Sequence, residues 1–297
     1  MASQRDVKNK IASVKNIQKI TRAMEMVAGA RLRRAEQRIA ALRPYADAIG
    51  RMTREAAAAA GAEAIRLPLL REHDSHTTAG LLLVTGDRGL AGGFNSQIIR
   101  AGVRLSGELS EQGMQSRWYA TGRRGVSSLE FRGVELSGSY RGFADKPAYA
   151  DARTIADDLM QAYIDGHIDR VVMVFNAYVS PLTQTVTQQT LLPLTGEALV
   201  GEQEGGERER SRASVEYEPD PERILRRLVP DYVEISVYRA LVESAAGFFG
   251  AQMTAMRSAS ENAGEIITDY TLQMNRARQA EITQEIMEVV AGAEGLG

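Results

Sequence analysis

Apolar side chains recur every three or four residues along both ends of the chain. At the N-terminal end the repeat runs from Val7 to Leu42 with a mean step of 3.5 residues, and at the C-terminal end it runs from Ile235 to Ala277 with the same mean. A step of 3.5 residues keeps one seam of a helix facing a partner helix. The pattern predicts that the two ends form long helices that pair as an antiparallel coiled coil. The expected seam residues are Val7, Ile11, Val14, Ile17, Met24, Leu32, Ile39 and Leu42 at the N-terminal end, and Val242, Phe249, Met256, Ile267, Tyr270 and Met274 at the C-terminal end.

The two helices carry opposite charge. Residues 1–43 contain eleven Lys and Arg against three Asp and Glu, whereas residues 231–290 contain four against nine. Complementary charge favours pairing of the helices with each other. A basic helix could also serve as an arm that binds nucleic acid, but pairing would cover its basic face, and the chain has only one Trp. We therefore expect no nucleic-acid partner.

Between these helices the hydrophobic pattern changes. Short apolar runs with the length of buried strands alternate with helical patterns, and this alternation predicts an α/β fold with mostly parallel strands. Strands are expected at 79–85, 117–120, 170–176 and 183–192, and helices at 95–112 and 149–166. The expected domains are an N-terminal coiled-coil helix at 1–64, an α/β domain at 65–214, and a turn with the C-terminal coiled-coil helix at 215–297.

Candidate catalytic chemistry is sparse. The chain has no Cys, and no apolar run approaches the ~18 residues of a membrane-spanning helix. The sequence GDRGLAGGFN at 86–95 lies where a phosphate-binding loop would lie, but it lacks both the Gly-Lys-Ser/Thr and the G-x-G-x-x-G patterns. The spacing of His73, His76 and His167 is not typical of a metal site. We expect no catalytic residue, metal or cofactor, and the alternative is an α/β nucleotide-dependent enzyme with a coiled-coil arm.

Several motifs, in order along the chain, carry a family resemblance. They are KITRAMEMVA at 19–28, RPYA at 43–46, TGDRGLAGGFN at 85–95, YEPDP at 217–221 and NRARQAEITQEIMEVVAGAE at 275–294. With these motifs the chain resembles the gamma subunit of F-type ATP synthases over essentially its whole length. The resemblance implies an antiparallel coiled coil of the two termini with a Rossmann-like α/β domain at its base. It also implies a non-catalytic rotor shaft that couples rotation of a membrane c ring, driven by hydrogen-ion flow, to ATP synthesis or hydrolysis.

The resemblance further implies partners and a location. The partners would be three alpha and three beta subunits, an epsilon subunit and the c ring, with one copy of this chain per complex. The chain would be a peripheral protein on the cytoplasmic face of a bacterial plasma membrane, held there only through the complex. Chemistry would take place in the beta subunits.

The resemblance also implies contact residues. Met24, Arg278, Gln279 and Thr283 would contact a beta subunit, and Tyr217 and Glu218 would lie next to the c ring. Residues 289–297 would lie in an apolar sleeve. If Met24 and Arg278 reach the same beta subunit, they lie level with each other, and the antiparallel register then places Ala35 opposite Ile267.

Overall fold

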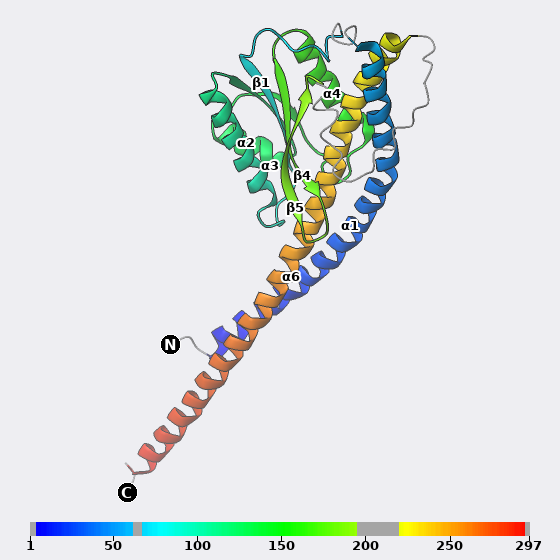
Figure 1. Ribbon diagram of the computed structural model, residues 1–297. Helices are drawn as coiled ribbons and strands as arrows, with labels where there is room; N and C mark the ends of the chain where they lie inside the picture. Colours follow the sequence, from blue (N-terminus) through cyan, green and yellow to red (C-terminus); the bar gives the residue numbers. More distant parts are fainter. Residues whose placement is uncertain (1–3, 62–66, 195–219, 295–297) are drawn as a thin grey trace. The chain divides into compact units, whose positions relative to one another are not determined.

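The computed structural model of the chain describes residues 4–61, 67–194 and 220–294. It consists of two compact units, one built from residues up to Gly29 and from Gln252 onward, the other from Ala30 to Ala251 (Figure 1). The helices are α1 (Gln4–Ala60), α2 (Phe94–Glu111), α3 (Arg123–Phe131), α4 (Tyr149–Ile164) and α6 (Pro221–Glu294). The strands are β1 (Thr78–Val84), β2 (Gln115–Thr121), β3 (Leu136–Tyr140), β4 (Arg170–Tyr178) and β5 (Gln184–Leu192).

The unit from Ala30 to Ala251 contains a five-stranded sheet in the order β3-β2-β1-β4-β5. The first four strands are parallel, and β5 pairs antiparallel with β4. The central strand β1 is buried over six of its seven residues, which is typical of a parallel strand covered on both faces. The expected α/β fold with mostly parallel strands is confirmed.

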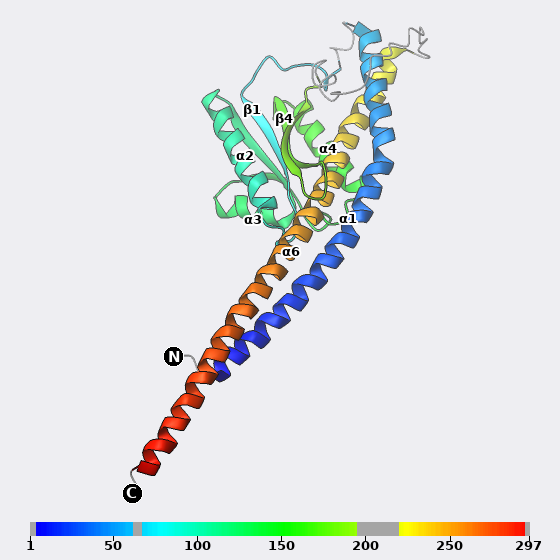
Figure 2. The same cartoon turned by 60° about the horizontal axis from the view of Figure 1, so that its bottom comes forward.

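Helices cover both faces of this sheet (Figures 1 and 2). On one face, α2 lies so close to β1 that a Cβ added at Gly102 would meet Leu83 at 2.9 Å. On the other face, α4 packs together with the end of α1 and the beginning of α6. The main core of the unit lies on this second face; its members include Ile49, Leu82, Ile155, Leu159, Met173, Leu225 and Val237.

Two elements of this unit were not predicted from the sequence. The strand β3 has the sequence LSGSY, in which no residue is fully buried, because it is the edge strand of the sheet. The helix α3 has nine residues and carries only three buried ones, so its periodic signal is short. The helix α6 is continuous from Pro221 and passes through Pro230.

The other unit is an antiparallel pair of helix segments, formed by the first part of α1 and the last part of α6. Glu25 accepts a hydrogen bond from Arg257 at 2.9 Å, and Lys10 lies 5.8 Å from the centroid of the Tyr270 ring. As the residue number rises on α1, the facing number falls on α6, which confirms the antiparallel coiled coil.

The register of this pair differs from the expected one. Arg257 lies beside Glu25, at the level where Arg278 was expected to lie. The expected facing of Met24 with Arg278 is therefore wrong, and so is the register that placed Ala35 opposite Ile267. The difference is about three heptads, and a slip by whole heptads leaves the same seam facing the partner. Hydrophobic periodicity alone therefore cannot distinguish these registers.

The observed register can be tested directly because the chain has no native Cys. We expect Glu25→Cys with Arg257→Cys to be joined rapidly by a short bis-maleimide, since these side chains already touch across the helices. We expect Glu25→Cys with Arg278→Cys to remain unlinked. The measurement is the mobility shift of the linked chain on a denaturing gel. Preferential linking of the second pair would restore the register expected from the sequence.

The seam itself contains a polar position. Val7, Ile11 and Thr21 are buried along α1, whereas Ile17, an expected seam residue, is 50% exposed. Gln18 lies toward α6 instead, and its side-chain nitrogen donates a hydrogen bond to the backbone oxygen of Ser260 at 3.1 Å. The expected placement of Ile17 in the seam is therefore wrong. The remaining expected seam residues of the two helices are buried or half-buried: Val14, Met24, Leu32, Ile39 and Leu42 on α1, and Val242, Phe249, Met256, Ile267, Tyr270 and Met274 on α6.

Candidate interaction site

The last part of α6 is exposed on all sides. From Arg278 to Ala291 every residue of the helix is exposed, whereas Met274 and Ala277 are still half-buried. The change occurs where the facing helix begins, since α1 starts at Gln4. This segment, residues 278–291, is called the free segment below.

The free segment carries large apolar side chains in contact with water. Ile286 is 58% exposed and Val289 is 73% exposed. Several such side chains gathered on one helix face mark a surface that binds another protein. The exposed apolar residues of the segment are Ile282, Ile286, Met287, Val289 and Val290.

The four residues expected to touch a beta subunit do not lie together. Arg278, Gln279 and Thr283 lie on the free segment and are exposed, with Thr283 donating a hydrogen bond to the backbone oxygen of Gln279 at 2.8 Å. Met24 is half-buried on α1, near the level of Arg257. Tyr217 and Glu218, expected next to the c ring, lie outside the described residues. Arg278, Gln279 and Thr283 are therefore the expected beta-subunit contacts that lie together, all of them on the free segment.

The sheet has a crevice of the kind that binds nucleotides in α/β proteins. The chain leaves β1 toward β2 on one side and returns to β4 on the other, so β1 and β4 form a switch point, and ligands bind at the carboxyl ends of such strands. Here α6 occupies that position. Ser244 donates a hydrogen bond to the Val84 carbonyl oxygen at 3.3 Å, and the Phe248 ring lies 3.0 Å from where a Cβ on Gly86 would be.

The space that remains at the switch point is small. A cavity of about 10 Å³ is bordered by Val84, Thr121 and Phe248, among others, and a volume of this size holds about one water molecule. A nucleotide therefore has no room there while α6 is in place.

The glycine-rich loop after β1 is closed by its own side chains. Asn95 accepts a hydrogen bond from the Gly86 amide at 2.8 Å and donates one to the Arg88 carbonyl oxygen at 3.1 Å. Asp87 accepts hydrogen bonds from the amides of Arg123 at 3.0 Å and Ala144 at 3.1 Å. The Gly86 amide, at the start of the loop, is thus bonded within the chain and is not free to hold a phosphate.

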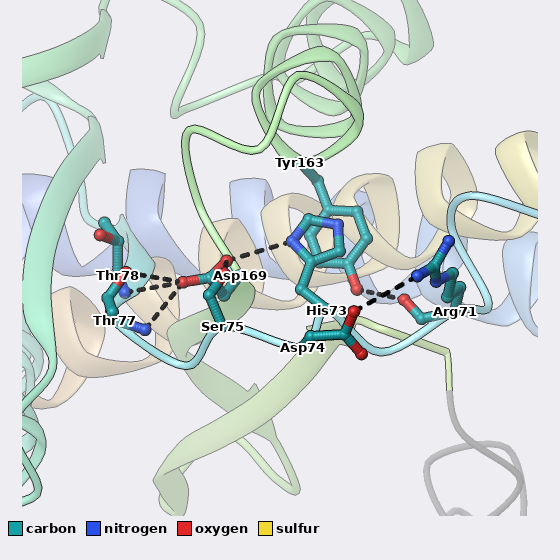
Figure 3. Close-up of polar contacts among 8 residues, drawn as sticks. All are labelled: Arg71, His73, Asp74, Ser75, Thr77, Thr78, Tyr163 and Asp169. Carbon is teal, nitrogen blue, oxygen red and sulfur yellow. Dashed lines mark hydrogen bonds and ion pairs between the residues drawn. The ribbon is translucent and has the colours of Figure 1, made fainter.

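The buried carboxylate Asp169 accepts several hydrogen bonds at the other end of the central strands, where β1 and β4 begin (Figure 3). Its oxygens accept hydrogen bonds from the amides of Thr77 at 2.8 Å and Thr78 at 2.9 Å, and from the Ser75 hydroxyl at 2.9 Å. His73 Nδ1 lies 3.1 Å from the same carboxylate. Sequence reasoning missed this group, because Asp169 is a single residue that is 92 positions away from Thr77.

The Asp169 group has Ser, His and Asp but not the arrangement of a catalytic triad. Ser75 and His73 both contact the same carboxylate oxygen, whereas a triad requires the His to lie between the other two. His73 is stacked on the Tyr163 ring with centroids 4.3 Å apart, and the Tyr163 hydroxyl donates to the Arg71 carbonyl oxygen at 2.7 Å. These contacts fasten the segment before β1 to α4 and β4.

Burial and hydrogen bonding shift the pKa of Asp169 in opposite directions. Burial by itself raises the pKa, but the hydrogen bonds from Thr78, Thr77, Ser75 and His73 outweigh burial and lower it from 3.8 to about 2. A carboxyl whose pKa is lowered by folding stabilises the folded state above its unfolded pKa. That contribution is lost as the pH falls from about 4 toward 2.

We expect Asp169→Asn to lower the free energy of unfolding by about 2–4 kcal/mol at pH 7, because an asparagine side chain is uncharged and has a single acceptor oxygen, whereas both carboxylate oxygens of Asp169 accept hydrogen bonds. The difference from the unsubstituted chain should shrink as the pH approaches 2, where the carboxylate becomes protonated. Urea unfolding at several pH values measures both effects. The matched control is Asp157→Asn, on the exposed surface of α4, which should change stability by less than about 0.5 kcal/mol. Equal stability losses for the two variants would contradict this prediction.

Residues 4–61, 67–194 and 220–294 contain no cluster of three or more His, Asp or Glu that could hold a metal ion. Within the same ranges, no helix has the length and apolar character needed to cross a membrane.

Known proteins resemble this chain over essentially its whole length. A family model described as ATP synthase matches residues 3–296. The ATP synthase gamma chain of Rubrobacter xylanophilus is 43% identical over 296 residues, covering 100% of this chain and 99% of that protein. The gamma chain of Frankia casuarinae is 42% identical over 301 residues, with coverage of 100% and 99%.

Solved structures agree. The central stalk and c-ring structure of the Tetrahymena thermophila mitochondrial ATP synthase contains a similar chain with a TM-score of 0.58 and 25% identity, covering 81% of this chain and 99% of that one. A chain of the Euglena gracilis mitochondrial ATP synthase has a TM-score of 0.66 at 14% identity, with coverage of 99% and 94%, and this likeness shows the shared fold.

Proposed function

The chain belongs to the ATP synthase gamma-chain family, and from this we propose that it is a non-catalytic rotor shaft on the cytoplasmic face of a bacterial plasma membrane. It couples rotation of a c ring, driven by hydrogen-ion flow, to ATP synthesis or hydrolysis in a ring of three alpha and three beta subunits. The observation that carries the proposal is the free segment, whose exposed apolar side chains need a protein partner.

The coiled coil suits this role physically. A two-helix rod with one face unlike the others presents different contacts to three identical beta subunits. Each contact stabilises a different conformation, which is a coupling free energy between rotor angle and nucleotide affinity. On this proposal Arg278, Gln279 and Thr283 on the free segment, together with Met24, contact a beta subunit, and Tyr217 and Glu218 lie against the c ring.

Co-purification tests the proposal. A tagged copy of the chain, recovered from detergent-treated membranes of the cell that produces it, should bring alpha, beta, epsilon and c subunits with it, with one copy of the chain for three beta subunits. Quantitative mass spectrometry of the recovered complex gives these ratios. Recovery of the chain without alpha and beta subunits would contradict the shaft proposal.

The alternative of a nucleotide-dependent enzyme predicts catalysis by the chain alone. We expect the isolated full-length chain not to hydrolyse ATP, because α6 fills the switch-point crevice and the loop after β1 lacks a phosphate-binding pattern. Release of phosphate is the measurement, with α₃β₃ complex containing the chain as the positive control. Hydrolysis by the chain alone that is lost on replacing Gly92 or Gly93 would favour the enzyme.

A further inference from the structure

A basic hollow of about 250 Å³ lies on the α/β unit. Its walls come from α1, from the loop that precedes α4 and from α6. The charged residues that line it are Arg31, Arg34 and Arg38 on α1, and Asp145 and Lys146 on the loop. Four cationic side chains thus meet a single carboxylate.

One of these cations is already fixed in place. Arg31 lies 3.3 Å from the Asp145 carboxylate, and its guanidinium lies 5.7 Å from the centroid of the Phe249 ring. Asp145 also lies 3.5 Å from Arg88, so its charge is shared between two guanidinium groups. The one acidic group of the hollow is therefore occupied and cannot neutralise the other cations.

The remaining cations lack a partner within the described ranges. No hydrogen bond or ion pair from another described side chain reaches Arg34, Arg38 or Lys146. Arg34 and Arg38 are four residues apart on one helix, where like charges repel and destabilise the helix. An anion in the hollow would remove this repulsion.

We propose that this hollow binds a compact polyanion with at least two oxyanion groups, held by Arg34, Arg38 and Lys146 beside the fixed Arg31. Guanidinium forks match the oxygen geometry of phosphate and carboxylate groups, and charge-assisted hydrogen bonds of this kind are the strong ones. The volume is below the range of about 300–1,000 Å³ that is typical of sites for drug-sized ligands, so it suits a small anion.

The shape of the hollow favours a small anion over an acidic protein segment. The cations converge on one concavity from two separate elements, α1 and the loop before α4. The floor includes Ala35 and Phe249, which are 5% and 3% exposed and are already covered by the chain itself. An acidic helix lying along α1 would need an exposed apolar strip to pack on, and this floor does not supply one.

The test is calorimetric titration of the full-length chain with inorganic pyrophosphate at low salt, and with citrate as the carboxylate counterpart. We expect saturable one-to-one binding that weakens as KCl is added, because salt screens exposed charges. The double substitution Arg34→Gln with Arg38→Gln should weaken binding roughly tenfold or more. The matched control is Arg33→Gln, an exposed arginine of the same turn that does not line the hollow, and it should leave binding unchanged.

Further controls decide between the outcomes. Arg34→Lys with Arg38→Lys keeps the charge and should retain part of the affinity, and circular dichroism shows whether each variant is folded. Tighter binding of pyrophosphate than of citrate would identify phosphate as the natural group, and the reverse would identify carboxylate. No saturable binding, or equal loss with Arg33→Gln, would overturn the proposal. Tighter binding of a hexaglutamate peptide than of either small anion would overturn it in favour of an acidic protein segment.

Discussion

A disulfide between Gln279→Cys and a cysteine on the neighbouring beta subunit is expected to nearly abolish ATP hydrolysis by the assembled complex. Gln279 lies on the free segment, where every described side chain is exposed and available to a partner. If the shaft turns against the beta subunits, one covalent link blocks every further step of the cycle. Reduction of the disulfide should restore the activity, which a coupled assay of ADP release measures before and after treatment with dithiothreitol.

A second link separates blocked rotation from general damage. Tyr217→Cys joined to a c subunit should leave hydrolysis and proton pumping largely intact, because this part of the chain and the c ring are proposed to turn as one body. Full activity with the beta link formed would rule out the shaft assignment. Loss of activity with the c link formed would show that residues near Tyr217 do not move with the ring.

Gly122→Ala is expected to have the largest effect on folding. Gly122 follows β2 with a φ of 79°, a left-handed conformation that residues with a Cβ rarely adopt. A Cβ at this position would also overlap the carbonyl oxygen of Thr85, which is backbone and cannot rotate away. The combined strain and overlap should cost about 4 kcal/mol or more, measured by urea unfolding.

The control for this substitution is the same change elsewhere in the same unit. Gly107 lies within α2, and a Cβ there would meet no atom within 4 Å. Gly107→Ala should therefore raise stability by about 1 kcal/mol, because Ala is the better helix former. Similar effects of the two substitutions would show that the conformation at Gly122 is not the constraint described.

Periodic burial made the helices and the central strands predictable from the sequence. The run that becomes β1 is apolar because both faces of the strand are covered, and the heptads of α1 and α6 follow from their pairing. The edge strand β3 lacks such a signal because it is half-buried at most. The general fold thus follows from the hydrophobic pattern, whereas the short edge strand β3 does not.

The contact residues were harder to predict, for two physical reasons. Whole-heptad slips preserve a coiled-coil seam, so the pattern could not show that Met24 and Arg278 are separated along the rod. The Asp169 group is assembled from residues far apart in the sequence, and its polar members, Ser75 and Thr77 among them, have no periodic signature. The exposure of the free segment could not be predicted without the register of the two helices, because only the register shows which part of α6 is covered by α1.

Gln18 has a consequence for a rod that carries torque. Load on two paired helices acts partly along the direction in which one can slide past the other, and a slide of seven residues would exchange most apolar seam contacts for equivalent ones. Gln18 has no such equivalent. Its amide lies 3.2 Å from where a Cβ on Gly264 would be, and Gly264 is the only glycine of α6 between Gln252 and Ala291. Sliding would break the hydrogen bond from Gln18 to the Ser260 backbone oxygen at a net cost of about 0.5–1.5 kcal/mol, so this position opposes slippage of one helix along the other under sustained load.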